Sequence, residues 1–112
     1  EEEVDGKIKT SYVAALTIDG AWKRVEENDA TVVWNPHTGQ YHATYEKDGK
    51  TIRMWIEDAD AVNAKTSLVH KYNLAGACVW AANFANESVW PVFERNLKQI
   101  KHYEEWKALV IE

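Results

Sequence analysis

Two short stretches of the sequence carry residues suited to chemistry or ligand binding. The first is the acidic pair Glu57-Asp58, which follows the stretch "TIRMWI". Neighbouring carboxyl groups can divide general acid and base roles, but an Asp before a helix is also a common N-cap. The second is the end of "AGACVWAAN", from Trp80 to Asn83. An indole presents a wide apolar face and one N–H donor, which suits either a packed core or the floor of a site for a flat ligand such as a sugar ring.

The other reactive side chains predict neither a metal nor a cofactor. Asp58 and Asp60 have no third ligand at a spacing suited to a cation. The histidines are scattered along the chain: His37, His42, His70 and His102. No two of them have the spacing of zinc metalloproteases, so surface histidines are expected. The single cysteine, Cys78, lies in an apolar run, which predicts a buried and unreactive thiol without an intramolecular disulfide.

The elements that would position these residues follow from hydrophobic periodicity in the second half of the chain. Thr51–Ile56 is predicted to be a strand, and Ala59–Tyr72 a helix with one apolar side and Asp58 as its N-cap. Ala75–Ala82 is apolar throughout, which is typical of a strand covered on both faces. A last helix is expected to begin at Glu87 or Ser88, with Trp90, Phe93, Leu97 and Ile100 on its apolar side.

This order of strand, helix, strand and helix is a βαβα unit of an α/β fold. In parallel α/β folds, ligands lie at the carboxyl ends of the strands. Glu57, Trp80 and Asn83 all fall at such ends, so they are the candidate binding residues.

The first half predicts one helix followed by an antiparallel hairpin. The helix lies within Ser11–Asn28, or is shortened to Gly20–Glu27 with Asp19 as its cap. Thr31–Trp34 is rich in β-branched residues and predicts a strand. Tyr41, Ala43 and Tyr45 then alternate with polar residues, and Asp48-Gly49 marks a hairpin turn to the strand ending at Ile56. We weigh two interpretations of Tyr41, Tyr45 and Trp55, an aromatic binding face or cross-strand packing, and packing is favoured.

Composition restricts the partners of the chain. Its 112 residues, 46% of them hydrophobic, suit a single folded domain, preceded by an acidic and flexible leader over residues 1–10. The net charge of −5 and the lack of a basic run argue against nucleic acid and anionic membrane surfaces. No apolar run reaches the length of a membrane span. The first residue is not Met, which we interpret as a processing or cloning boundary.

The segment "MWIEDADAVNAKTSLVHKYNLAGACVWAANFANESVW" resembles the last quarter of glycoside hydrolase family 18 barrels, most closely the bacterial spore-germination and cortex-lytic type. The shared features are a strand ending W-x-E-D, a helix with a spaced lysine (Lys65), then Y-x-L-x-G, a strand ending in Trp and a later V-W. The preceding segment, from Ala21 to Trp55, is similar to the helix and inserted hairpin of that group. After the tryptophan, the group usually has a basic residue, an apolar residue and Gly, where this chain has Ala81, Ala82 and Asn83.

The resemblance implies a partial (β/α)₈-barrel unit with an inserted antiparallel β-hairpin. Thr51–Ile56 would be barrel strand seven and Ala75–Ala82 strand eight. Trp80 would line the floor of the subsite holding the sugar to be cleaved, with Glu57 and Asn83 at the same strand ends. The family's catalytic signature, D-x-x-D-x-D-x-E, carries the general acid on strand four, and this chain does not contain it. No catalytic residue is therefore assigned.

Since a whole barrel needs about 250 residues, we interpret the chain as the C-terminal portion of such an enzyme and expect it to be inactive alone. The resemblance implies a substrate polymer containing N-acetylglucosamine, either peptidoglycan or chitin, and a secreted, cell-wall or spore-coat location. Two alternatives stay open: a non-catalytic carbohydrate-binding or assembly module, and a purely structural interaction domain. Open strand edges also predict a homo-oligomer or a domain swap.

Overall fold

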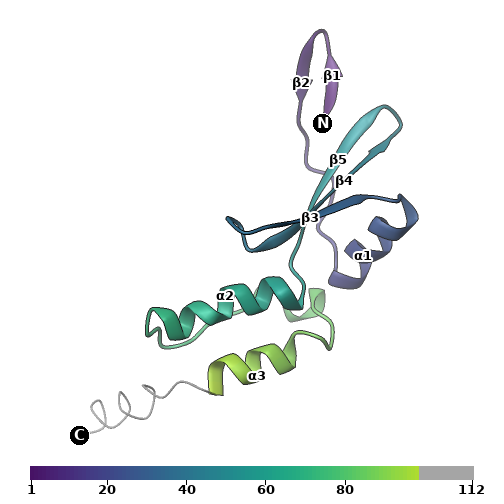
Figure 1. Ribbon diagram of the computed structural model, residues 1–112. Coiled ribbons are helices and arrows are strands. Elements are labelled where there is room, and N and C mark those ends of the chain that lie inside the picture. The colour runs from purple at the N-terminus through teal and green to yellow at the C-terminus, as the bar shows by residue number, and fades with distance from the viewer. Residues whose placement is uncertain (99–112) are drawn as a thin grey trace, which may run out of the picture. The chain divides into compact units, whose positions relative to one another are not determined.

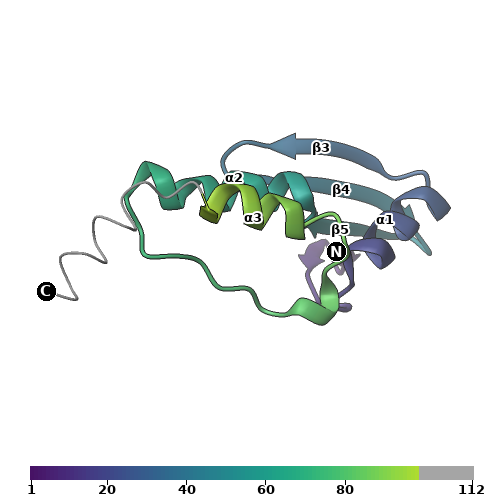
Figure 2. The same ribbon diagram turned by 90° about the horizontal axis from the view of Figure 1, so that it is seen from below.

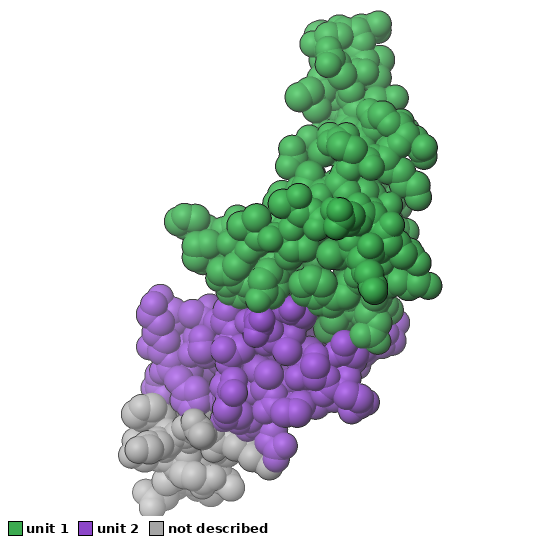
Figure 3. All heavy atoms as spheres, turned by 45° about the vertical axis from the view of Figure 1, so that its right-hand side comes forward, with its two compact units in different colours: residues 1–57 green, residues 58–112 purple. Residues whose placement is uncertain are grey.

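The structure is a computed structural model and describes residues 1–98. The chain forms two compact units, the first comprising Glu1–Glu57 and the second beginning at Asp58 (Figure 3). Each unit has buried residues of its own, and each is described separately. Ile100 and His102, which were considered in the sequence, lie outside the described residues.

Unit 1 is built on a three-stranded antiparallel sheet (Figure 1). The strands are β3 (Thr31–Asn35), β4 (Gln40–Lys47) and β5 (Lys50–Ile56), in the order β3-β4-β5. The predicted strands and hairpin are thereby confirmed, and β3 also pairs with β4. Asp48 and Gly49 both have positive φ, 52° and 72°, as a tight two-residue hairpin turn between β4 and β5 requires.

Strand alternation divides the residues of this sheet between two faces. Tyr41, Ala43 and Tyr45 share one face of β4, opposite the buried Met54 and Ile56 of β5. Helix α1 (Ile18–Glu27) packs on this face through Ala21, with Trp22 and Val25 partly buried beside it. Ile56 is only 1% exposed, and burial of such a side chain stabilises the fold by roughly 1.5–3 kcal/mol.

Helix α1 begins at Ile18, close to the shorter of the two predicted helices. Thr17, rather than Asp19, is its N-cap, because the Thr17 hydroxyl accepts a hydrogen bond from the Gly20 amide at 3.0 Å. Asp19 lies in the first turn, where a negative charge interacts favourably with the helix dipole. The prediction of a helix within Ser11–Asn28 is therefore confirmed, and the alternative with Asp19 as the cap was wrong.

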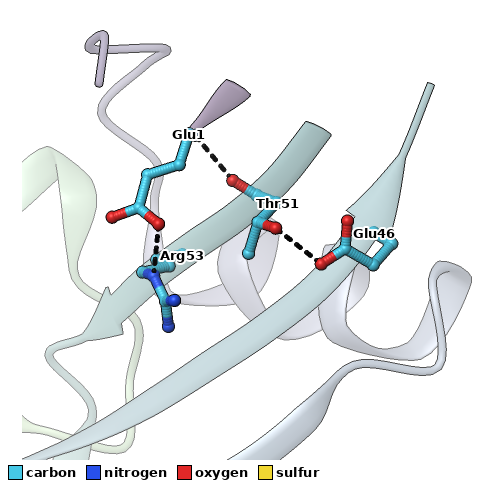
Figure 4. Close-up of polar contacts among 4 residues, drawn as sticks. All are labelled: Glu1, Glu46, Thr51 and Arg53. Atoms are coloured by element: carbon cyan, nitrogen blue, oxygen red, sulfur yellow. Dashed lines mark hydrogen bonds and ion pairs between the residues drawn. The ribbon is translucent and has the colours of Figure 1, made fainter. Parts of the chain in front are cut away.

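The first ten residues form a hairpin rather than the expected flexible leader. Strands β1 (Glu2–Val4) and β2 (Lys7–Lys9) pair in an antiparallel register. Glu1 and Thr51 exchange two backbone hydrogen bonds, at 2.7 Å and 2.9 Å, which fixes the start of the chain beside β5. The Glu1 carboxylate also accepts from the Arg53 Nε at 3.1 Å (Figure 4). The acidic composition of this segment did not predict these hydrogen bonds between Glu1 and β5.

Unit 2 consists of two helices joined by a long return segment, residues 72–81, and a short turn. Helix α2 (Ala59–Lys71) is followed by the 3₁₀ turn η1 (Ala82–Phe84) and by α3 (Trp90–Lys98). Asp58 caps α2 as predicted, because its Oδ1 accepts from the amides of Asp60 and Ala61, each at 3.1 Å. The return segment runs back toward the start of α2, so α2 and α3 lie side by side and point the same way (Figure 2). The buried residues are Ala61, Thr66, Val69 and Val89.

The predicted strand Ala75–Ala82 was wrong as an element of secondary structure. Both sheets described within residues 1–98 are antiparallel, and neither contains this segment. A strand needs a hydrogen-bonded neighbour on at least one side, and no described strand pairs with this segment. The described residues thus form a small mixed α/β structure with three helices and no closed barrel, which is consistent with a fragment.

Loss of the strand also changes the environment of its side chains. Cys78 is exposed, so the expectation of a buried thiol was wrong.

Trp90, expected on the apolar side of the last helix, is 40% exposed. Among the described residues, none of the helices is both long and apolar enough to span a bilayer.

Candidate functional site

Trp80 lies at the end of the return segment of unit 2, immediately before η1. Its side chain is 97% exposed, so it does not pack in the core of this structure. The Trp80–Ala81 peptide bond is cis. Within this segment, Leu74 and Val79 are also exposed, at 46% and 45%. The indole is thus presented on a surface, where its flat apolar face is open to a ligand.

Asn83 follows Trp80 by three residues and lies in the short turn η1. This turn is held by two backbone hydrogen bonds, from Phe84 to Ala81 at 3.0 Å and from Ala85 to Ala82 at 3.1 Å. The Asn83 side chain is exposed. An amide supplies both donors and acceptors, so Asn83 adds polar capacity to the same stretch of chain as the indole.

Glu57 is the last residue of unit 1, whereas Trp80 and Asn83 belong to unit 2. Its exposed carboxylate accepts a short hydrogen bond from the side-chain amide of Gln40. This contact joins the end of β5 to the start of β4. The three candidate binding residues therefore divide between the units, and only Trp80 and Asn83 share one.

Asp58, the other half of the acidic pair, has a structural role as the cap of α2. Burial is the largest cause that raises the pKa of its carboxyl above the ordinary value of 3.8, and the charge of Asp60 raises it further. Hydrogen bonds from the amides of Ala61 and Asp60 act in the opposite direction. This combination describes a partly desolvated N-cap and accounts for the acidic pair without chemistry.

A chitinase shares the fold of this chain. The crystal structure of the chitinase from Chromobacterium violaceum ATCC 12472 matches it with a TM-score of 0.67 and 25% sequence identity. The match covers 75% of this chain and 27% of the chitinase chain, so the present chain spans only about a quarter of that protein. No protein-family model and no curated protein sequence matches. The likeness is consistent with a glycoside hydrolase fragment.

A second surface lies on the face of the unit 1 sheet opposite α1, and only one of the three aromatic residues considered for a binding face lies on it. Trp55 lies there and is 57% exposed, while Tyr41 and Tyr45 lie on the core face. Packing was therefore the correct interpretation for the two tyrosines, and Trp55 is separate from them. The alternation of side chains along the strands could have separated them. Trp55 pairs with His42, and His42 and its neighbour Tyr41 point to opposite faces of the sheet.

Within residues 1–98, no group of three or more His, Cys, Asp or Glu side chains is placed to hold a metal ion. His37 lies in the β3–β4 turn, His42 on β4 and His70 in the last turn of α2. The His70 Nε2 lies 2.5 Å from the carbonyl oxygen of Asn96, a contact between α2 and α3.

Proposed function

We propose that this chain is the C-terminal part of a family 18-like glycoside hydrolase of the spore-germination and cortex-lytic type. The intact enzyme would act on polymers containing N-acetylglucosamine, either peptidoglycan or chitin. The observation that supports this most is the likeness to a chitinase over 75% of the chain. Secretion, or a location in the cell wall or spore coat, is part of the same proposal.

In this proposal Trp80 forms the floor of the subsite that holds the sugar to be cleaved. A pyranose ring has an apolar C–H face, which stacks on an indole while its hydroxyl groups remain free for hydrogen bonds. The 97% exposure of Trp80 leaves the ring accessible for such stacking. Asn83, which lies in the same unit as Trp80, would contribute polar contacts to substrate.

The general acid would come from outside this chain. Cleavage of a glycosidic bond requires protonation of the leaving oxygen, which a positioned carboxylic acid supplies. The sequence lacks the D-x-x-D-x-D-x-E signature that carries this acid in the resembled family. The 112-residue chain alone is therefore expected to show no hydrolysis.

The test is expression of the complete gene product, with the strand-four signature included, and assay on chitin oligosaccharides and peptidoglycan. Hydrolysis is expected, and Trp80→Ala should lower kcat/KM by about 10-fold to 100-fold, since truncation of an aromatic anchor commonly costs about 1–3 kcal/mol. Trp90→Phe serves as a control, because Trp90 is a partly exposed indole on α3. A gene product that begins near Glu1, or a complete barrel without activity on either polymer, would overturn the proposal.

A non-catalytic carbohydrate-binding module is the second candidate. The exposed Trp80 supports it, since an aromatic platform binds sugar without any acid. Binding of an oligosaccharide by a gene product that has no strand-four signature would favour this candidate over the enzyme.

A further inference from the structure

The open face of the unit 1 sheet, opposite α1, carries an exposed aromatic patch. Val33, His42 and Trp55 stand directly opposite one another on β3, β4 and β5. Val33 is 59% exposed and Trp55 is 57% exposed. The His42 and Trp55 rings lie 5.1 Å apart with an interplanar angle of 42°, so one side of the indole packs while the rest remains open. This arrangement holds a flat apolar surface in a fixed place.

Polar side chains border this patch on both sides along the strands. Gln40 and Glu57 lie two residues from His42 and Trp55, at one end of β4 and β5, and are hydrogen-bonded to each other. Thr44 and Arg53 pair directly on the other side. Two residues along a strand span roughly 7 Å, so amide, carboxylate, hydroxyl and guanidinium groups surround a platform about the width of one sugar ring.

The charges around the patch are mixed in sign. Glu57 is negative, and the positive Arg53 is paired with the Glu1 carboxylate at 3.1 Å. A phosphate ligand or a cationic peptide would need a surface of one dominant sign. A neutral ligand with one apolar face and a ring of hydroxyl groups matches both the platform and its border.

We propose that this open face binds a neutral pyranose ring of an oligosaccharide, with Trp55 as the stacking residue and Gln40, Glu57 and Arg53 as hydrogen-bonding residues. The choice of sugar rests on the proposed function, but the site is distinct from Trp80. It lies wholly within unit 1 and requires no catalytic group. Unit 1 is then a sugar-binding module in its own right.

The test is an NMR titration of the 112-residue chain with tetra-N-acetylchitotetraose, following the indole Nε1–H signals. Each signal is assigned from a single Trp→Phe variant. We expect saturable shifts of the Trp55 signal, a loss of affinity of at least about tenfold in Trp55→Ala, and a smaller loss in Trp55→Phe, which keeps an aromatic ring. Trp80→Ala should leave the Trp55 titration unchanged, and Trp90→Phe is the matched control.

Two results would overturn the inference: a Trp55 signal that does not move at saturating ligand, or a folded Trp55→Ala variant with wild-type affinity. The first result is read from the unmodified chain, and the Trp55→Phe variant serves there only to assign the signal. If Trp80 responds and Trp55 does not, the second site is wrong while the proposed function keeps its support. Failure of the proposed function is seen separately, in the hydrolysis assay on the complete gene product.

Discussion

His42 has a buried polar atom with no hydrogen-bond partner within the described residues. Its Nε2 is the atom concerned, and the ring lies against Trp55. A buried and unsatisfied nitrogen costs folding free energy, typically about 1–3 kcal/mol when water is fully excluded. His42 therefore acts on the open face as a packing group more than as a hydrogen-bonding one.

His42→Phe should keep or raise stability, by up to about 1 kcal/mol, because the phenyl ring preserves packing on Trp55 and removes the unsatisfied nitrogen. Urea unfolding followed by circular dichroism measures the change. His37→Phe is the control, since His37 is exposed in the β3–β4 turn and should change stability little. A loss of more than about 1 kcal/mol in His42→Phe would show that the imidazole makes a polar contact in solution.

Individual side chains were predictable where strand parity decided their direction. Alternation along β4 separated Tyr41, Ala43 and Tyr45 from His42, and the structure places them on opposite faces. The exposure of Trp80 and Cys78 could not be predicted from alternation, because the segment 75–82 is apolar throughout. Such a run is buried only when neighbouring strands cover it, and the sequence of the run does not contain those neighbours.

At the scale of elements, the start of α2 depends on Asp58, which is the N-cap of the helix and whose pKa is raised. Since the pKa of Asp58 is raised in the folded state, the native protein holds this proton more tightly than the unfolded chain does. The stability contributed by the protonated form is fully present below pH 3.8. It is lost as the pH rises through the higher pKa of the folded state.

Asp58→Asn should therefore remove this loss of stability with rising pH and keep the helix cap, because Asn is as good an N-cap as Asp. At pH 7 we expect stability equal to wild type or higher by up to about 0.5 kcal/mol, whereas Asp58→Ala should lose about 1 kcal/mol. Unfolding free energies measured at several pH values upward from 3 test both. Asp60→Asn keeps the cap and removes one repulsive charge. It should therefore reduce the change of unfolding free energy with pH only in part. If Asp58→Asn left the pH dependence of the unfolding free energy unchanged, Asp58 would not be its source.

A group of polar side chains joins α2 to α3. Asn96 donates from Nδ2 to the Asn63 Oδ1 at 3.0 Å and to the Thr66 hydroxyl at 2.7 Å. Arg95 donates to the same Asn63 oxygen at 2.6 Å. The buried Thr66 hydroxyl in turn donates to the Val62 carbonyl at 2.7 Å, so its bonding capacity is used on both sides. Because the apolar core of unit 2 is small, these contacts have a large share in fixing the helix register.

Asn96→Ala should destabilise the chain by about 1–2 kcal/mol, because it removes the bonds to Asn63 and Thr66. Asn63→Ala should cost a similar amount. The double variant should cost at least about 0.5 kcal/mol less than the sum, since the two residues share one bond. Urea unfolding measures all three, and Ser67→Ala, at an exposed position on α2, is the control. Strict additivity would show that the two side chains do not interact in solution.

Elements were predictable where local signals were complete. The Asp48-Gly49 turn, the alternation of β4 and the Asp58 cap each depend on a few adjacent residues, and each is present in the structure. Thr17 was missed as the cap of α1 because Asp19 lies nearby and is an equally good capping type. The segment 75–82 required partners distant in sequence, so its composition alone gave the wrong element.

At the scale of the whole molecule, unit 2 exposes an apolar return segment. Leu74, Val79 and Trp80 are exposed at 46%, 45% and 97%. Exposed apolar side chains that gather on one short segment commonly mark a contact with another polypeptide. The chain spans about a quarter of the chitinase that it resembles, so the return segment of the isolated chain is expected to find a substitute partner in a second copy.

We therefore expect the isolated chain to self-associate as its concentration rises from micromolar to millimolar, as measured by sedimentation equilibrium. Val79→Lys should weaken this association by at least about tenfold, because association would bury the new charge. Ile8→Lys is the matched control, since Ile8 is 73% exposed on the β1–β2 hairpin and lies outside the return segment. A monomer at every concentration would refute self-association. Equal weakening by both variants would place the contact elsewhere, because only a contact made by the return segment can distinguish position 79 from position 8.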